Sequence, residues 1–149
     1  MPRTHIYLDI SPATPADLTA VLELIDASGL PRAGLDAHIA TTLVARENSR
    51  IVGTAALELY GGSALLRSVA VAAALRGQGL GHRLTTAALE LARQRGVRTV
   101  YLLTETAGEF FPKFGFKKIE RSDVDQAVQA SQEFTSACPA SALVMAKQI

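Results

Sequence analysis

The sequence predicts one mixed α/β domain, in which helices cover both faces of a largely antiparallel sheet of about six to seven strands. Three observations lead to this fold class. Apolar segments and turn residues alternate in the order strand, helix, three strands, helix, strand, helix and two strands. The chain has 149 residues, of which 48% are hydrophobic, and this suits a single compact domain spanning residues 1–149. The three consecutive strands are joined by short turns, as in an antiparallel meander.

The N-terminal region is expected to form a short strand and then a helix. The apolar residues at 6–10 suit a strand. Thr14 suits a helix N-cap, Pro15 the first helical position, and Asp17 the acidic partner three residues after the cap. Gly29 stands where a left-handed residue would end the helix. We therefore expect a helix that begins after Thr14 and ends near Gly29.

The next region predicts a short helix at 35–39 and then the meander. Apolar and β-branched residues gather in three segments, at 41–46, 51–60 and 64–71. Polar residues separate the first two segments, and the pair Gly61 and Gly62 separates the last two. A two-residue glycine turn would join those last two strands as a hairpin.

The C-terminal half alternates between helices and strands. A helical pattern runs from Leu80 to near Gly96 and is followed by a buried strand. Pro112 should shorten or distort the helix expected at 107–114, because proline removes a helical hydrogen bond. The remaining expected elements are the strands at 99–104, 116–121 and 142–147 and a helix around 124–130.

Composition limits the classes of function. Fifteen basic and fourteen acidic residues give a net charge of +1, so the chain lacks the basic surplus that favours nucleic acid binding. No apolar run approaches the roughly 18 to 20 residues that span a bilayer, and no hydrophobic signal segment opens the chain. We expect a cytoplasmic protein. Cys138 is the single cysteine, which excludes an intrachain disulfide, and we expect no metal site.

A glycine-rich loop follows the strand at 64–71 and leads into the helix that begins at Leu80. Gly77, Gly79 and Gly81 lie where backbone amides at a helix start point outward, and Arg76 adds a positive charge. Such a loop suits a diphosphate. A dinucleotide-binding fingerprint would need glycine where His82 stands, and the Gly-Lys-Ser or Gly-Lys-Thr of a P-loop is absent. A glycine-rich turn without a ligand is the remaining alternative.

The spacing Arg-x-x-Gly-x-Gly at 76–81 resembles the acetyl-coenzyme A signature of the GCN5-related N-acetyltransferase (GNAT) superfamily. Segments 10–18, 51–53 and 114–116 are also similar to that family, so the resemblance covers nearly the whole chain. It implies acetyl-CoA as cosubstrate and a strand that splays from its neighbour to offer backbone groups to the pantetheine arm. The coenzyme contacts that follow are Val69, Val71, Arg76, Gly77, Gln78, Gly79, Leu80, Gly81, His82 and Thr104.

Two further segments, 66–71 and 133–142, are similar to the N-acetyltransferases associated with arsenic resistance. That subgroup in turn resembles the acetyltransferase domain of N-acetylglutamate synthases. The resemblance implies a small amino acid, or an arsenic- or phosphorus-containing analogue of one, as the acceptor. In the family, a tyrosine after the fifth strand commonly protonates the leaving thiolate, and Phe111 stands at that position. The usual acid is therefore missing.

Glu58 and Arg67 are candidates for the acceptor site. If Gly61 and Gly62 form a two-residue hairpin, Glu58 pairs with Leu65 and becomes a diagonal neighbour of Arg67. Glu58 would then be the general base, directly or through water, and Arg67 would hold the acceptor carboxylate. A cross-strand ion pair without a catalytic role is the alternative, and a three-residue turn would remove the pairing.

Glu133, Cys138 and Ser141 are the other candidates for the acceptor site, if the last strand returns beside the coenzyme. Cys138 can equally be a small buried hydrophobic residue. We expect an acetyl-CoA-dependent N-acetyltransferase whose partner is a small-molecule amine, with no nucleic acid and no membrane. A non-catalytic acyl-CoA-binding module and an enzyme that acetylates protein or peptide amines are the alternatives, and the sequence leaves open whether the chain forms a homodimer.

Overall fold

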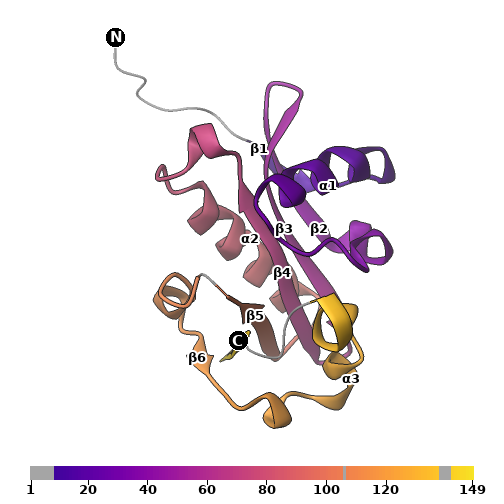
Figure 1. Ribbon diagram of the computed structural model, residues 1–149, viewed down its shortest axis with the longest axis vertical. Coiled ribbons are helices and arrows are strands. Elements are labelled where there is room, and N and C mark those ends of the chain that lie inside the picture. The colour runs from indigo at the N-terminus through magenta and orange to yellow at the C-terminus, as the bar shows by residue number, and fades with distance from the viewer. Residues whose placement is uncertain (1–8, 106, 138–141) are drawn as a thin grey trace.

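The computed structural model describes residues 9–105, 107–137 and 142–149. Its strands are β1 Asp9–Pro12, β2 Thr42–Glu47, β3 Arg50–Tyr60, β4 Ser63–Val71, β5 Thr99–Thr104, β6 Lys117–Lys118 and β7 Leu143–Gln148 (Figure 1). Its α-helices are α1 Leu18–Ala27, α2 Leu80–Gln94 and α3 Gln126–Gln129. Short 3-10 helices occur at Pro15–Asp17, Leu35–Thr41, Ala73–Leu75, Phe111–Phe114 and Arg121–Asp123, and a π-helical turn at Glu133–Ala137.

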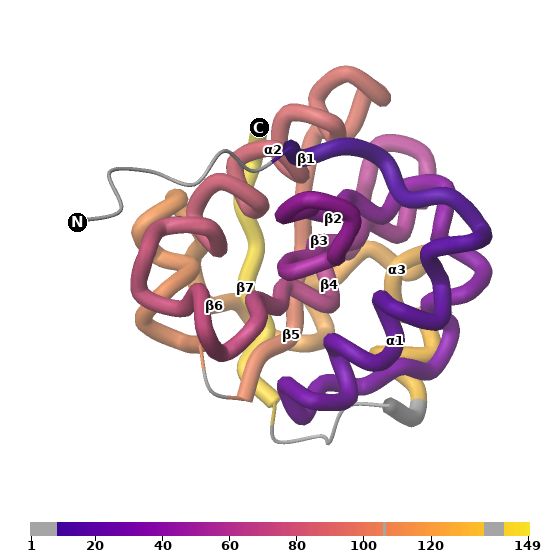
Figure 2. The backbone as a smooth tube through the Cα atoms, turned by 90° about the horizontal axis from the view of Figure 1, so that it is seen from above, coloured from indigo at the N-terminus to yellow at the C-terminus, as the bar shows by residue number. Residues whose placement is uncertain are grey.

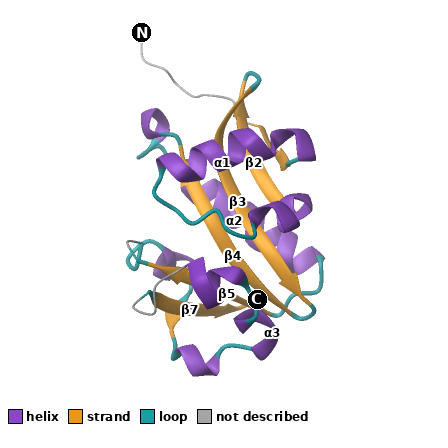
Figure 3. Cartoon of the chain, turned by 45° about the vertical axis from the view of Figure 1, so that its right-hand side comes forward, coloured by secondary structure: helices purple, strands orange, loops and turns teal. Residues whose placement is uncertain are grey.

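The strands form one seven-stranded sheet in the order β1-β2-β3-β4-β5-β7-β6. Every neighbouring pair is antiparallel except β4 and β5, which run parallel. Figure 3 shows β5 and β7 turned at an angle to β4, so the sheet divides at its one parallel step. The predicted fold class, a mixed and largely antiparallel sheet with helices, is confirmed.

The two long helices cover opposite faces of the sheet (Figure 2). Leu84 and Ala88 of α2 share one core with Ala55 and Leu57 of β3. Val21 and Ile25 of α1 share another with Ala56 of the same strand. Successive side chains of a strand point to opposite faces, so the alternation within β3 places α1 and α2 on either side.

The first helix starts and ends at the residues that the sequence indicated. The Asp17 carboxylate accepts a hydrogen bond of 2.8 Å from the Thr14 N–H, which satisfies a backbone donor at the helix start. The first turn is a 3-10 helix, and α1 proper begins at Leu18. Gly29 closes the helix at φ 71°, in the left-handed conformation that glycine adopts easily.

Three elements differ from the expected ones. The helix expected at 107–114 shrinks to the single turn Phe111–Phe114, because Pro112 lies inside it. The strand expected at 116–121 pairs only at Lys117–Lys118, where both lysines are exposed on the sheet edge beside β7. The helix expected around 124–130 is α3, which has four residues.

The strand expected at 6–10 falls mostly outside the described residues, and β1 begins at Asp9. Among the described residues, none of the helices combines the length and the apolar character needed to cross a lipid bilayer.

Candidate functional site

The candidate site is a cavity between β4 and β5. Backbone pairing between these strands runs from the pair Ser63 and Thr99 to the pair Leu66 and Leu102, although β4 continues to Val71. The diverging ends enclose a cavity of about 490 Å³. Its wall is formed by residues of β4, β5, the start of α2, the aromatic turn after β5 and the loop after α1: Ser28, Gly29, Leu30, Pro31, Leu66, Arg67, Ser68, Val69, Ala70, Val71, Gly81, Leu102, Leu103, Thr104, Glu105, Ala107, Phe110, Phe111 and Glu133.

A bulge in β4 lies on the wall of this cavity. Thr54 pairs with Ala70 and Ala56 pairs with Arg67, so β4 has one residue more than β3 over this step. Ser68 adopts φ 58°, a left-handed conformation that costs energy for any residue with a side chain. Such strained conformations gather at functional sites. The bulge therefore changes the direction of the strand where it leaves β5.

The glycine loop lies at the start of α2. Gly77 and Gly79 have φ of 81° and 84°, and a Cβ atom at either position would meet no atom within 4 Å. These glycines are thus required by backbone conformation rather than by space. The first helical hydrogen bond of α2 runs from the Arg83 N–H to the Gly79 carbonyl, at 3.1 Å. The N–H groups of the preceding helical residues lack intrahelical acceptors and suit an anion.

Other predicted coenzyme residues lie in the glycine loop or on the cavity wall. Arg76 is exposed, and its Nε donates to the Val71 carbonyl at 3.1 Å, which ties the loop to the end of β4. Val69, Val71 and Gly81 line the cavity. Thr104 lines it too, and its Oγ1 accepts a bond of 2.9 Å from the Ala107 N–H.

Three residues of the loop region point elsewhere or to solvent. Leu80 is buried in the core beneath the helix start, whereas Gln78 is exposed. His82 is exposed on α2, and its ring lies 4.7 Å from that of Phe114. Within this loop the backbone, rather than the side chains, faces the place where an anion would bind.

The aromatic turn after β5 provides no acid. Phe111 is buried in the core, with its ring centroid 5.9 Å from that of Phe116. Phe110 is less buried and also lines the cavity. Neither side chain can donate a proton, so the thiolate acid of the resembling family has no counterpart at these two positions.

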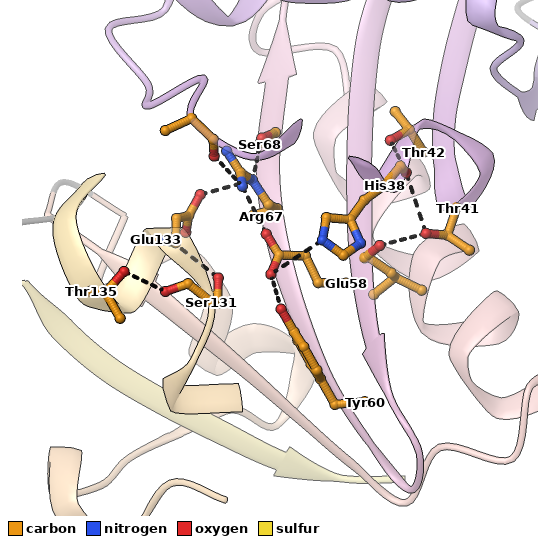
Figure 4. Close-up of polar contacts among 12 residues, drawn as sticks. His38, Thr41, Thr42, Glu58, Tyr60, Arg67, Ser68, Ser131, Glu133 and Thr135 are labelled. Carbon is orange, nitrogen blue, oxygen red and sulfur yellow. Dashed lines mark hydrogen bonds and ion pairs between the residues drawn. The ribbon is translucent and has the colours of Figure 1, made fainter. Parts of the chain in front are cut away.

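The hairpin predicted from Gly61 and Gly62 is confirmed. Tyr60 pairs with Ser63 and Glu58 pairs with Leu65, which makes Glu58 a diagonal neighbour of Arg67. Arg67 Nη1 lies 2.8 Å from Glu58 Oε2, and both side chains are buried, at 0% and 1% exposure (Figure 4). The pair is therefore not a weak, exposed one, and the catalytic role of Glu58 stays a prediction.

Arg67 is the centre of a larger polar network. Its Nη1 also donates to the Ala33 carbonyl at 2.8 Å, and its Nη2 donates to the Pro31 carbonyl at 3.1 Å. Its Nε donates to Ser68 Oγ at 3.1 Å and lies 3.0 Å from Glu133 Oε2. Within the described part of the chain, these contacts leave one Nη2–H of the five guanidinium N–H groups without an acceptor. Arg67 thus fixes the loop after α1 over the cavity.

Glu58 is held as a carboxylate. Burial by itself would raise the pKa of the Glu58 carboxyl, but hydrogen bonds from Tyr60, Arg67 and Ser131 outweigh it, and the pKa is lowered. Burial and the interaction with Glu58 raise the pKa of Tyr60 to about 12. His38 Nε2 lies 3.7 Å from Glu58 Oε1. Glu58 itself is not part of the cavity wall.

Glu133, unlike Glu58, lines the cavity. It opens the π-helical turn, and its backbone N–H donates to Ser131 Oγ at 3.1 Å. Its side chain is 4% exposed. Cys138 and Ser141, the other two predicted acceptor residues, lie outside the described residues.

Sequence reasoning missed several members of this network. His38, Tyr60 and Ser131 carry no motif, and the carbonyls of Pro31 and Ala33 have no signature in the sequence. The spacing of Tyr60 from Glu58 was the one available signal, because residues two apart in a strand share a face.

Comparison with known proteins places these observations in a family. A family model described as the acetyltransferase (GNAT) domain matches residues 38–118. An uncharacterized N-acetyltransferase of Chlorobaculum tepidum is 33% identical over 92 residues, which cover 61% of this chain and 59% of that protein. An amino-acid acetyltransferase of Mycobacterium tuberculosis is 38% identical over 81 residues, or 53% of this chain and 45% of that protein. The chain spans about half the length of these curated relatives.

A solved structure has the same fold over most of the chain. N-acetylglutamate synthase from Neisseria gonorrhoeae, complexed with coenzyme A and N-acetyl-glutamate, superposes with a TM-score of 0.82 at 19% identity. The superposition covers 97% of this chain and 36% of that one.

Proposed function

The chain belongs to the GNAT acetyltransferase domain family, as its glycine loop predicted, and we propose that it is an acetyl-CoA-dependent N-acetyltransferase for a small amine. The observation that carries this proposal is the cavity between β4 and β5, whose wall includes Gly81 of the glycine loop at one end and Arg67 and Glu133 of the polar network at the other. The first end suits a coenzyme pyrophosphate, and the second provides ionised groups for an acceptor.

The coenzyme would bind mainly to backbone groups. The pyrophosphate would lie at the unpaired N–H groups that open α2, where the helix dipole and Arg76 both favour negative charge. The pantetheine arm would follow the edge of β4 at Val69 and Val71, since β5 does not pair with that edge. The thioester would then reach the bulge at Ser68, beside Arg67.

The acceptor would be an amino acid or an analogue of one. This part of the proposal is supported by the relatives, which include an amino-acid acetyltransferase and a synthase crystallised with N-acetyl-glutamate. Arg67 lines the cavity and would offer its remaining Nη2–H to the acceptor carboxylate. An arsenic- or phosphorus-containing analogue, as in the arsenic-resistance subgroup, is the narrower form of the same proposal.

Calorimetric titration with acetyl-CoA tests the coenzyme half. We expect the intact protein to bind, and Gly79→Trp to abolish binding, because a residue with a side chain is strained at this positive φ and the indole would shift the loop amides. Absence of binding by the intact protein, or equal binding by the variant, would contradict the coenzyme site.

Thiol release in the presence of acetyl-CoA tests the acceptor half. The acceptors are the standard L-amino acids and phosphorus-containing amino-acid analogues, each compared with the amine that lacks its carboxylate. Arg67→Lys should raise KM for the carboxylate-bearing acceptor and leave KM for acetyl-CoA unchanged, because lysine keeps the charge but loses the planar guanidinium. Coenzyme binding without turnover on any amine would favour the non-catalytic alternative, which the absence of an acid at Phe111 suggests.

A further inference from the structure

The two glutamates that flank Arg67 occupy different positions. Glu58 lies on β3 and does not line the cavity. Arg67, its partner in the ion pair, does line the cavity. Glu133 lines the same wall as Arg67, with its Oε2 at 3.0 Å from Arg67 Nε. Of these two carboxylates, that of Glu133 is therefore the one that a molecule bound in the cavity can reach.

The charge of the cluster favours a cation. Two carboxylates, Glu58 and Glu133, share one guanidinium, and all three side chains are at most 4% exposed. The two carboxylates thus outnumber the guanidinium that lies between them. A buried site of this kind attracts an ammonium group strongly, because little solvent screens the interaction. The acceptor of the proposed reaction arrives with its amine protonated at neutral pH.

We propose that Glu133 binds the ammonium group of the acceptor and removes its proton. This inference rests on the proposed function and assigns to Glu133 the part of the general base. One proton passes from the ammonium to the Glu133 carboxylate, which frees the nitrogen lone pair. The nitrogen then attacks the carbonyl carbon of acetyl-CoA, and a C–N bond forms.

The remaining steps balance without a further acid. As the tetrahedral intermediate collapses, the C–S bond breaks and the sulfur leaves with the bonding electron pair as a thiolate. The nitrogen, now bonded to the acetyl carbon, loses its second proton to that thiolate. The proton on Glu133 passes to solvent, so the products are the amide, coenzyme A and one proton. This route needs no donor at Phe111, which has none.

Glu58 is less suited to this part. It does not line the cavity, and its two oxygens accept hydrogen bonds from the Tyr60 hydroxyl and from Arg67 Nη1, the latter at 2.8 Å. Its lowered pKa, caused by hydrogen bonds that outweigh burial, makes it a weak proton acceptor. Glu58 instead fixes the guanidinium edge that faces away from Glu133. The earlier prediction of Glu58 as the base stays a prediction that the same experiment can decide.

Glu105 is the other carboxylate of the cavity wall. It is exposed, so solvent screens its attraction for an ammonium group. It serves as the comparison in the test below.

The test compares Glu133→Gln with the intact protein, using acetyl-CoA and the best acceptor among the standard L-amino acids. At neutral pH, kcat/KM should fall by roughly 100-fold, the size of a general-base effect. As the pH rises to the pKa of the acceptor's own amine, the ratio between the two proteins should shrink, since a neutral amine needs no base. Arg67, Glu58, Tyr60, His38 and Glu105 are present in both proteins, so the comparison tests the carboxylate of Glu133.

Calorimetric titration with acetyl-CoA shows that the variant is folded, and its Kd should stay within about twofold of that of the intact protein. Glu90→Gln, on the exposed side of α2, is the surface control and should keep full activity. A loss that is equal at every pH would mean a structural role and overturn the inference. The inference would also be overturned if Glu133→Gln kept full activity. It would be overturned too if Glu105→Gln or Glu58→Gln, rather than Glu133→Gln, showed the pH-dependent loss of kcat/KM. If the intact protein acetylates no amine, the proposed function itself fails.

Discussion

The two ends of the cavity are built by different means. At the end proposed for the coenzyme, residues 76–81 form a loop and the start of α2, where Arg76 and Gln78 are exposed and the first helical N–H groups lack intrahelical acceptors. At the acceptor end, buried charged side chains come from strands β3 and β4 and from the π-helical turn before β7, with the loop after α1 providing carbonyls. One end depends on backbone conformation, and the other on the pairing of charges.

Because of this difference, the two ends should tolerate different kinds of substitution. A backbone site should tolerate side-chain changes that preserve φ, because the contacts are N–H groups. A buried charge network should tolerate few changes, because the removal of one member leaves its partners charged and unpaired. Strain in the first end should therefore weaken coenzyme binding, whereas removal of the shared cation from the second should lower the stability of the fold.

The largest expected effect is that of Arg67→Ala. This change leaves the carboxylates of Glu58 and Glu133 buried without their cation, so the free energy of unfolding should fall by about 3–5 kcal/mol. Urea denaturation measures this quantity. Arg93→Ala is the matched control, because Arg93 pairs with Glu90 at the surface with both side chains more than half exposed. Arg93→Ala should lower the free energy of unfolding by at most about 1 kcal/mol. Equal losses in the two variants would show that the acceptor end is no more dependent on charge than the surface.

The part of the network within the hairpin could be predicted from the sequence, and the rest could not. Gly61 and Gly62 allow a two-residue turn, and this turn fixes the register that brings Glu58 to Arg67. Glu133 reaches the same guanidinium from a position 66 residues further along the chain, and the short helical turns around it are too brief to give a periodic signal.

The shape of β4 shows the same limit. A strand was predicted at 64–71, but a bulge at Ser68 was not, because serine carries no signal for a positive φ as glycine does. The glycine loop could be predicted because all of its determinants are local: the φ of Gly77 and Gly79 and the start of α2 lie within six residues of one another. Local backbone signals therefore predict the glycine loop, whereas the Arg67 network depends on long-range contacts that local signals do not predict.

A smaller effect is expected for Gly79→Ala, which tests the coenzyme end. Alanine at φ 84° should cost about 1–2 kcal/mol in the free energy of unfolding, because in this left-handed conformation a Cβ crowds the carbonyl oxygen that follows it in the chain. Relief of this strain would move the loop amides, so Kd for acetyl-CoA should rise by about tenfold.

Gly61→Ala is the matched control for that variant. Gly61 has φ 64° and equally open surroundings, but it lies in the hairpin turn between β3 and β4. Its substitution should cost a similar free energy of unfolding and leave Kd for acetyl-CoA unchanged. If both alanine variants raise Kd for acetyl-CoA equally, the glycine loop has no special role in coenzyme binding, and the contrast between the two ends disappears.

The smallest effect concerns the alkaline stability of the acceptor end. The pKa of Tyr60 is raised from 10.0 to about 12 by burial and by Glu58, so the neutral phenol stabilises the fold. For a group whose pKa is raised on folding, this stabilisation is complete below pH 10.0 and is lost as the pH rises through about 12. The difference in unfolding free energy between the intact protein and Tyr60→Phe should thus be constant up to the lower pH and shrink above it. Because Tyr60 is only partly buried, solvent screening limits the change to on the order of 1 kcal/mol. Urea denaturation of both proteins across this pH range measures the difference, and a constant difference would mean that Tyr60 does not share its proton with a charged Glu58.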